Sequence, residues 1–217
     1  MRLLVWVGVY FAAIVASAIA FALVSGGASA DDLSGARTFL TNLPLQLVLG
    51  GGAFVVATLS APRPDLWLGL DRGPWRESAV GFGIGIVTQF ALIPIYLPVR
   101  WVFEGDPSDD AQELVDRFSD GERVLLLLMV VVLAPVVEEL FYRGALQGLM
   151  GERLDPLPAI VVTAAVFAFL HFQVLPFLGL FIVGVVAGLV RHRTGRLAPA
   201  MWMHAGFNSI SIALLLA

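Results

Sequence analysis

Apolar residues occur in seven long runs that are separated by short polar segments. The runs cover residues 3–24, 39–60, 78–99, 123–150, 156–172, 176–190 and 199–217. A helix of about 20 apolar residues crosses the hydrocarbon core of a bilayer. The pattern therefore predicts an all-α, polytopic membrane protein with about seven transmembrane helices.

The first run has a second interpretation, as a signal peptide. Ala28-Ser29-Ala30 follows it and resembles a cleavage site. The apolar stretch is too long for the central region of a signal peptide, so we expect a membrane helix.

The acidic segment 100–122 differs from the other polar segments. Four of its apolar residues fall on one face of a helix, namely Ala111, Leu114, Val115 and Phe118. Asp109 and Asp110 precede that face and are predicted helix caps. We expect a short interfacial helix that serves as a scaffold or a lid.

Composition supports the membrane assignment. Hydrophobic residues make up 59% of the 217 residues and charged residues 14%, whereas a soluble domain has about 25% charged residues. The chain has no cysteine, which excludes disulfides, thiolate nucleophiles and thiolate metal sites. All thirteen basic residues are arginine and form no basic run, so no nucleic-acid partner is expected. The lack of lysine suggests a high-GC bacterial source, and hence a bacterial cell membrane.

The arginines also predict an orientation. With the N-terminus inside, eight arginines fall on inner segments: Arg2, Arg63, Arg72, Arg76, Arg153, Arg191, Arg193 and Arg196. The outer segments hold four, diluted by acids, so the positive-inside rule favours a cytoplasmic N-terminus. We expect one membrane domain over 1–217, with N-terminal spans and the acidic loop in 1–122 and, in 123–217, the helices that carry three polar motifs.

Three ionisable residues interrupt the fourth run: Glu138, Glu139 and Arg143. Each costs about 2.5–3.5 kcal/mol to insert at membrane depth, which makes a functional role the default hypothesis. Glu139 and Arg143 are four residues apart and can form an ion pair. Glu138 lies about 100° round the helix with no cation one turn away, so it is a candidate general base. Pro135 is expected to kink this helix. A purely structural salt-bridge cluster is the alternative.

Two further polar sites occur in the apolar runs of the C-terminal half. His171 is predicted inside the fifth helix, and His204 and Asn208 share one face of the seventh. His192 lies among arginines and is expected to be solvated. Counting the helical rise from the inner end of each helix places Glu138, His171, His204 and Asn208 at depths that scatter about the membrane midplane. We therefore expect these residues to meet. One such histidine is usually a packing residue, but together with an unpaired glutamate they indicate a site.

These motifs resemble those of the CPBP intramembrane proteases, the group of CAAX prenyl endopeptidases and bacteriocin-processing proteins formerly called the abortive-infection family. The matching pattern is Glu-Glu-x-x-x-Arg, then Phe-x-x-x-His, then His-x-x-x-Asn. It falls on Glu138, Glu139 and Arg143, on Phe167 and His171, and on His204 and Asn208. The resemblance covers about residues 125–212.

The resemblance implies an intramembrane glutamic endopeptidase that cleaves a membrane-associated peptide or protein without a cofactor. Glu138 would activate a water and His171 would assist it. His204 and Asn208 would bind the oxyanion, and Glu139 with Arg143 would support the site.

Two alternatives remain open. Two histidines and a glutamate could hold a zinc ion, which would make the protein a zinc-dependent intramembrane protease, although asparagine is a poor zinc ligand. A non-catalytic transport, immunity or scaffold protein would use its polar groups to line an ion path.

Overall fold

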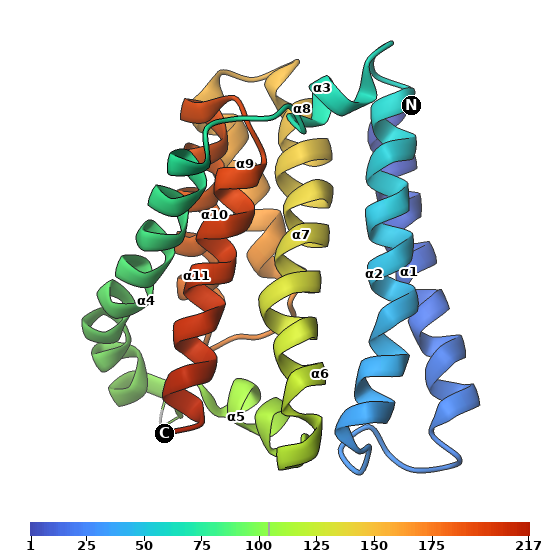
Figure 1. Cartoon of the computed structure of the whole chain (residues 1–217), viewed down its shortest axis with the longest axis vertical. Helices are drawn as coiled ribbons and strands as arrows, with labels where there is room; N and C mark the ends of the chain where they lie inside the picture. The colour runs from blue at the N-terminus through green and yellow to red at the C-terminus, as the bar shows by residue number, and fades with distance from the viewer. Residues whose placement is uncertain (104) are drawn as a thin grey trace.

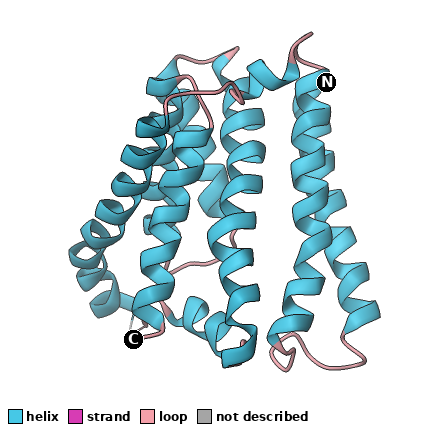
Figure 2. Ribbon diagram, in the orientation of Figure 1, coloured by secondary structure: helices cyan, strands magenta, loops and turns pink. Residues whose placement is uncertain are grey.

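The computed structural model describes residues 1–103 and 105–217, so Glu104 of the acidic segment lies outside the described residues. Every regular element in those two ranges is helical (Figure 2). In chain order the elements are α1 (Arg2–Val24), α2 (Gly35–Thr58), α3 (Pro64–Leu68), α4 (Trp75–Phe103), α5 (Asp109–Asp116), the 3₁₀ turn η1 (Asp120–Glu122), α6 (Arg123–Leu127), η2 (Leu128–Leu133), α7 (Ala134–Glu138), η3 (Glu139–Leu146), α8 (Gln147–Gly151), α9 (Pro156–Phe169), α10 (Phe177–Thr194) and α11 (Ala198–Leu215). The predicted all-α class is confirmed.

Five helical stretches among the described residues are long and apolar enough to cross a membrane: 2–24, 35–58, 75–102, 120–151 and 177–194. The other two expected spans are α9, an apolar helix of only 14 residues, and α11, which carries His204 and Asn208. The polytopic membrane fold is confirmed, whereas the count of seven spans is not.

The helix that carries the glutamate pair is continuous from α6 to α8 but changes its winding twice. The segments η2 and η3 are π-helical. The N–H of Ala134 donates to the carbonyl of Met129, five residues back, and the N–H of Gln147 donates to Tyr142 in the same way. Single π-turns inside α-helices often occur at functional sites. The expected disturbance near Pro135 is therefore a change of register around residues 128–146.

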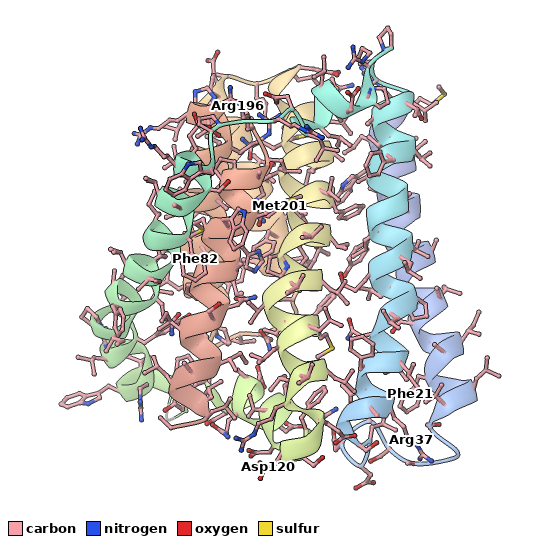
Figure 3. The ribbon with its side chains drawn as sticks, in the orientation of Figure 1. Phe21, Arg37, Phe82, Asp120, Arg196 and Met201 are labelled. Atoms are coloured by element: carbon pink, nitrogen blue, oxygen red, sulfur yellow. The ribbon has the colours of Figure 1, made fainter. Side chains whose placement is uncertain are left out.

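The helices run between two ends of the bundle (Figure 1). One end holds the N-terminus, α3 and the turn between α10 and α11, and the opposite end holds α5 and the C-terminus. Figure 3 shows Arg196 at the first end and Arg37 and Asp120 at the other. Ion pairs tie segments together at each end, Arg2 to Glu152 at 2.6 Å and Arg117 to Asp31 at 3.2 Å.

The short helix α5 and the turn after it bury part of the predicted apolar face. Val115 and Phe118 join a cluster with Leu126, Met129 and Ile212. The predicted caps are wrong, because Ser108 occupies the N-cap position while Asp109 and Asp110 lie in the first turn. There they still complement the positive end of the helix dipole.

Glycines allow two close helix contacts, one between α2 and α1 and the other between α4 and α11. A methyl group on Gly52 of α2 would overlap the side chain of Val9, so this glycine allows a close contact between α2 and α1. Small residues allow such close approach between membrane helices. In α4, a methyl group on Gly85 would overlap the backbone of Met203. This contact fixes α11 against α4 next to His204.

Candidate active site

Glu139, Arg143 and His204 form a buried polar cluster. Oε1 of Glu139 accepts from Arg143 Nη1 at 2.8 Å and lies 3.0 Å from Nδ1 of His204. Glu139 is 0%, Arg143 1% and His204 5% exposed. The ion pair expected from the four-residue spacing is therefore present, and it binds a histidine that is 65 residues away in sequence.

The contact with Glu139 fixes the orientation of the His204 ring. The carboxylate that accepts from the Arg143 guanidinium has no proton to donate, so Nδ1 of His204 must be the donor and carries a proton. Its Nε2 then presents a lone pair when the ring is neutral and an N–H only when the ring is protonated.

Part of this cluster lacks hydrogen-bond partners among the described residues. The atoms concerned are Glu139 Oε2 and the Nε and Nη2 of Arg143. A buried polar atom without a partner costs about 1–3 kcal/mol, so the cluster depends on other contacts. One is the ring of Phe167, which lies 4.3 Å from Arg143 Cζ and makes a cation–π contact.

The ring of Phe167 is the point at which the three motifs meet. Its centroid is 5.1 Å from that of Tyr142, 4.6 Å from that of His171 and 6.1 Å from that of His204. All three pairs meet edge to face, the preferred geometry for such rings. A buried phenylalanine thus joins residues of η3, α11 and the turn after α9.

His171 lies in the turn that follows α9, so its predicted place inside a helix is wrong. The helix ends at Phe169, and Phe172 adopts a positive φ of 55°. Nδ1 of His171 donates to the carbonyl of Phe167 at 2.7 Å, which satisfies one of the carbonyls left free at a helix end. As in His204, Nε2 makes no hydrogen bond within residues 1–103 and 105–217.

Asn208 contacts the helix of the glutamate pair rather than the other site residues. Its Nδ2 donates to the carbonyl of Val130 in η2 at 2.8 Å. The second N–H of this amide makes no hydrogen bond with the part of the chain that the structure describes, so one donor remains available.

Glu138 differs from the adjacent Glu139 in its burial and in its contacts. It is half-buried, and within residues 1–103 and 105–217 its carboxylate makes no hydrogen bond or ion pair. The adjacent Glu139 is fully buried and already paired. The two neighbouring carboxylates therefore have separate environments, one buried and paired and the other partly open.

The N-terminal helix supports the site from outside the motifs. Trp6 stacks on Phe141 at 4.4 Å and donates its Nε1 to the Phe141 carbonyl at 3.0 Å. The Tyr10 hydroxyl donates to the Leu170 carbonyl at 3.4 Å, just before His171. These contacts could not be predicted from the sequence, because an aromatic residue in an apolar run is also suited to a lipid-facing surface.

An apolar groove of about 510 Å³ opens beside this turn, lined by Trp6, Val7, Tyr10, Phe11, Ala165, Val166, Phe169, Leu170 and Phe177. Its lining can accept an apolar side chain or lipid chain but offers nothing to a charged one.

The zinc alternative requires at least three suitable donors that converge on one point. Among the described residues, no three side chains of His, Cys, Asp or Glu converge closely enough to hold a metal. Glu139 is engaged by Arg143 and by Nδ1 of His204.

Comparison with known proteins agrees with the motifs. The family model of type II CAAX prenyl endopeptidase Rce1-like proteins matches residues 120–210. This segment contains the glutamate pair, His171, His204 and Asn208. No curated protein and no solved structure matches the chain. In these helices the chain is similar to the Rce1-like CAAX endopeptidases, which supports its assignment as a CPBP family intramembrane protease.

Proposed function

We propose that the chain hydrolyses a peptide bond of a membrane-associated peptide or protein, with Glu138 as the base that activates water. The family supplies the class of reaction, CAAX-type endopeptidase activity. It also favours hydrolysis over the transport, immunity and scaffold alternatives. The catalytic type and the role of each residue are the proposal.

In this mechanism the Glu138 carboxylate removes a proton from water while the hydroxide adds to the scissile carbonyl carbon. The free N–H of Asn208 donates to the oxyanion. When the C–N bond breaks, Glu138 returns its proton to the leaving amine, so atoms and charge balance. His171 holds the attacking water through its free Nε2.

The role of His204 is narrower than the motif resemblance implies. Its Nδ1–H points at Glu139, so Nε2 can donate to an oxyanion only in the protonated ring. Asn208 needs no such change, and we assign it the larger share of oxyanion binding. Glu139 and Arg143 act through His204 as positioning residues.

One observation carries the assignment of the base. Glu139 is fully buried and shares its Oε1 between Arg143 and His204. The half-buried Glu138 is the carboxylate of the pair that makes no such contact within the described residues. A general base must take up and release a proton, and a carboxylate that is not held in an ion pair is suited to this role.

The test requires a substrate, which a comparison of membrane proteomes from wild-type and Glu138→Ala cells would identify as an uncleaved precursor. Cleavage by purified Glu138→Gln should then fall by at least about 10²–10⁴, with helix content and thermal stability in detergent unchanged. Glu152→Gln is the matched control, since Glu152 pairs with Arg2 outside the site, and should keep wild-type turnover. Near-normal turnover by Glu138→Gln would rule out this mechanism.

A further inference from the structure

A second groove lies between α4 and α10 at the arginine-rich end of the bundle. Its volume is about 380 Å³, and its lining comprises Arg76, Glu77, Val80, Gly81 and Ile84 of α4 and Val186, Leu189, Val190, Arg193 and Thr194 of α10. It involves none of the residues assigned to hydrolysis.

The lining is arranged as two stripes, each with an arginine at the same end. In α4, residues 76, 80 and 84 follow one another at four-residue spacing, and in α10 residues 186, 190 and 193 do so at similar spacing. Such spacing places each set on one helix face. Away from the arginines the stripes are apolar, so the groove has a cationic mouth and an apolar floor.

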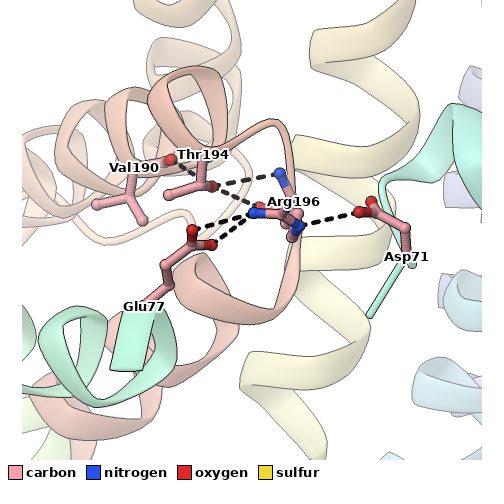
Figure 4. A network of polar contacts seen from close by, with 5 residues as sticks. All are labelled: Asp71, Glu77, Val190, Thr194 and Arg196. Atoms are coloured by element: carbon pink, nitrogen blue, oxygen red, sulfur yellow. Dashed lines mark hydrogen bonds and ion pairs between the residues drawn. The ribbon is translucent and has the colours of Figure 1, made fainter. Parts of the chain in front are cut away.

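The single acid of this lining is already neutralised. Both oxygens of Glu77 accept from Arg196 Nη1, at 3.0 and 2.8 Å, and Arg196 Nε donates to Asp71 at 2.9 Å (Figure 4). Thr194 is also engaged, with the Val190 carbonyl and the backbone of Arg196.

Among the described residues, Arg76 and Arg193 have no acidic partner. Both are exposed, and no ion pair of either side chain occurs in the part of the chain that the structure describes. The N-terminus of the long helix α4, at Trp75, adds a partial positive charge to the same mouth. Trp75 is 74% exposed, as suits a side chain at headgroup level.

We propose that this groove binds one anionic phospholipid. Its phosphate lies between Arg76 and Arg193, and one acyl chain lies along Val80, Ile84, Val186 and Val190. Basic pockets between membrane helices recognise such headgroups. The apolar floor selects a lipid over a soluble anion, and the two arginines select an anionic lipid over a zwitterionic one.

Bound lipid should stabilise the helix that carries His204 and Asn208. Glu77 lies in the groove and holds Arg196, which begins the segment leading into α11. In addition, α4 packs closely on α11 through Gly81 and Gly85. A ligand that binds only the folded state raises its stability by mass action.

The experiment measures lipid binding and thermal stability of the purified chain in mild detergent. Phosphatidylglycerol should bind and raise Tm, whereas phosphatidylcholine and inorganic phosphate should not. Arg76→Gln and Arg193→Gln should each weaken binding of phosphatidylglycerol about five-fold, and the double variant about 25-fold, from about 1 kcal/mol per arginine near a membrane surface. Val186→Trp fills the floor and should weaken binding with the charges retained.

Arg72→Gln is the matched control. Arg72 is exposed, lies near the same end of α4, and is not part of the lining. The proposal fails if Arg72→Gln weakens binding as much as Arg76→Gln, because the effect would then be general surface charge. It fails equally if phosphatidylcholine binds as well as phosphatidylglycerol, or if inorganic phosphate alone reproduces the rise in Tm.

Discussion

Asn208 and Val130 are joined by a hydrogen bond of 2.8 Å between a side-chain amide and a backbone carbonyl. The Val130 carbonyl needs this donor because of the residue five positions further along the helix, Pro135. Ala134 donates its N–H to Met129 in the π-register, so the Val130 carbonyl would take the N–H of residue 135. Residue 135 is proline, which has none. The amide of α11 replaces the missing donor, and the proline thereby fixes where Asn208 lies.

Asn208→Ala should therefore have two separable effects. It should lower kcat by about 10²–10³, the size of losing one oxyanion donor, while KM changes little. It should also reduce stability by about 1 kcal/mol, because the Val130 carbonyl loses its partner. Steady-state cleavage and thermal unfolding in detergent measure the two.

Pro135→Ala supplies the missing backbone N–H and separates these effects. Added to Asn208→Ala, it should recover stability but not kcat. If Asn208→Ala raised KM with kcat intact, Asn208 would dock the substrate instead. Recovery of kcat by the second substitution would show that Asn208 acts only through the backbone of η2.

Arg143→Ala should lower the free energy of unfolding by about 3–5 kcal/mol, because it leaves the fully buried Glu139 without its cation. Arg153→Ala is the control: Arg153 is exposed and only caps the Leu149 carbonyl, so its loss should cost far less. Thermal or chemical unfolding in one detergent measures both. Unchanged stability of an inactive Arg143→Ala would place Arg143 among the catalytic residues.

Replacing Glu139 and Arg143 together by methionine should recover much of the lost stability, since a buried ion pair is often no more stable than apolar side chains of similar size. Activity should stay lost, because Nδ1 of His204 no longer has its acceptor. A double variant that cleaves at the wild-type rate would show that the cluster does not position the histidine.

Phe167→Leu should reduce both stability and turnover. The leucine keeps most of the apolar volume but loses the cation–π contact with Arg143 and the edge contacts with His171 and His204. Together these are worth about 1–3 kcal/mol. Phe169→Leu changes a 64% exposed ring of the same helix and should leave both properties near wild type. Equal effects of the two variants would contradict a role for the Phe167 ring in joining the motifs.

Activity should survive prolonged treatment with strong chelators, and the purified chain should carry far less than one zinc per molecule. The measurements are metal analysis and cleavage before and after chelation. Stoichiometric zinc that is lost and restored together with activity would decide for the metalloprotease alternative.

The pair Glu139–Arg143 could be predicted because its geometry is local: four residues along a helix bring the two groups to one face. The contact between Glu139 and His204 could not, since it depends on how α11 packs on η3. His171 was placed inside a helix because the apolar pattern continues to Phe172, although the helix ends at Phe169. The spacing of apolar residues does not reveal that the side chain of His171 caps the end of α9 through the Phe167 carbonyl.

The contact of Asn208 with the helix of Pro135 is partly predictable from the sequence. A proline inside a polar-bearing apolar helix leaves a carbonyl without a donor, and a side-chain amide in another apolar helix is a natural partner. The sequence points to the need for such a donor, but only the packing of α11 identifies which carbonyl it serves.

The contact between Trp6 and Phe141 has a consequence for biosynthesis. The two residues are separated by 135 positions, so α1 leaves the ribosome long before its partner exists. It can meet α2 early but must wait in the bilayer for η3. The helix α1 is therefore synthesised well before the segment on which it packs, and η3 gains the support of Trp6 only when α1 closes against it.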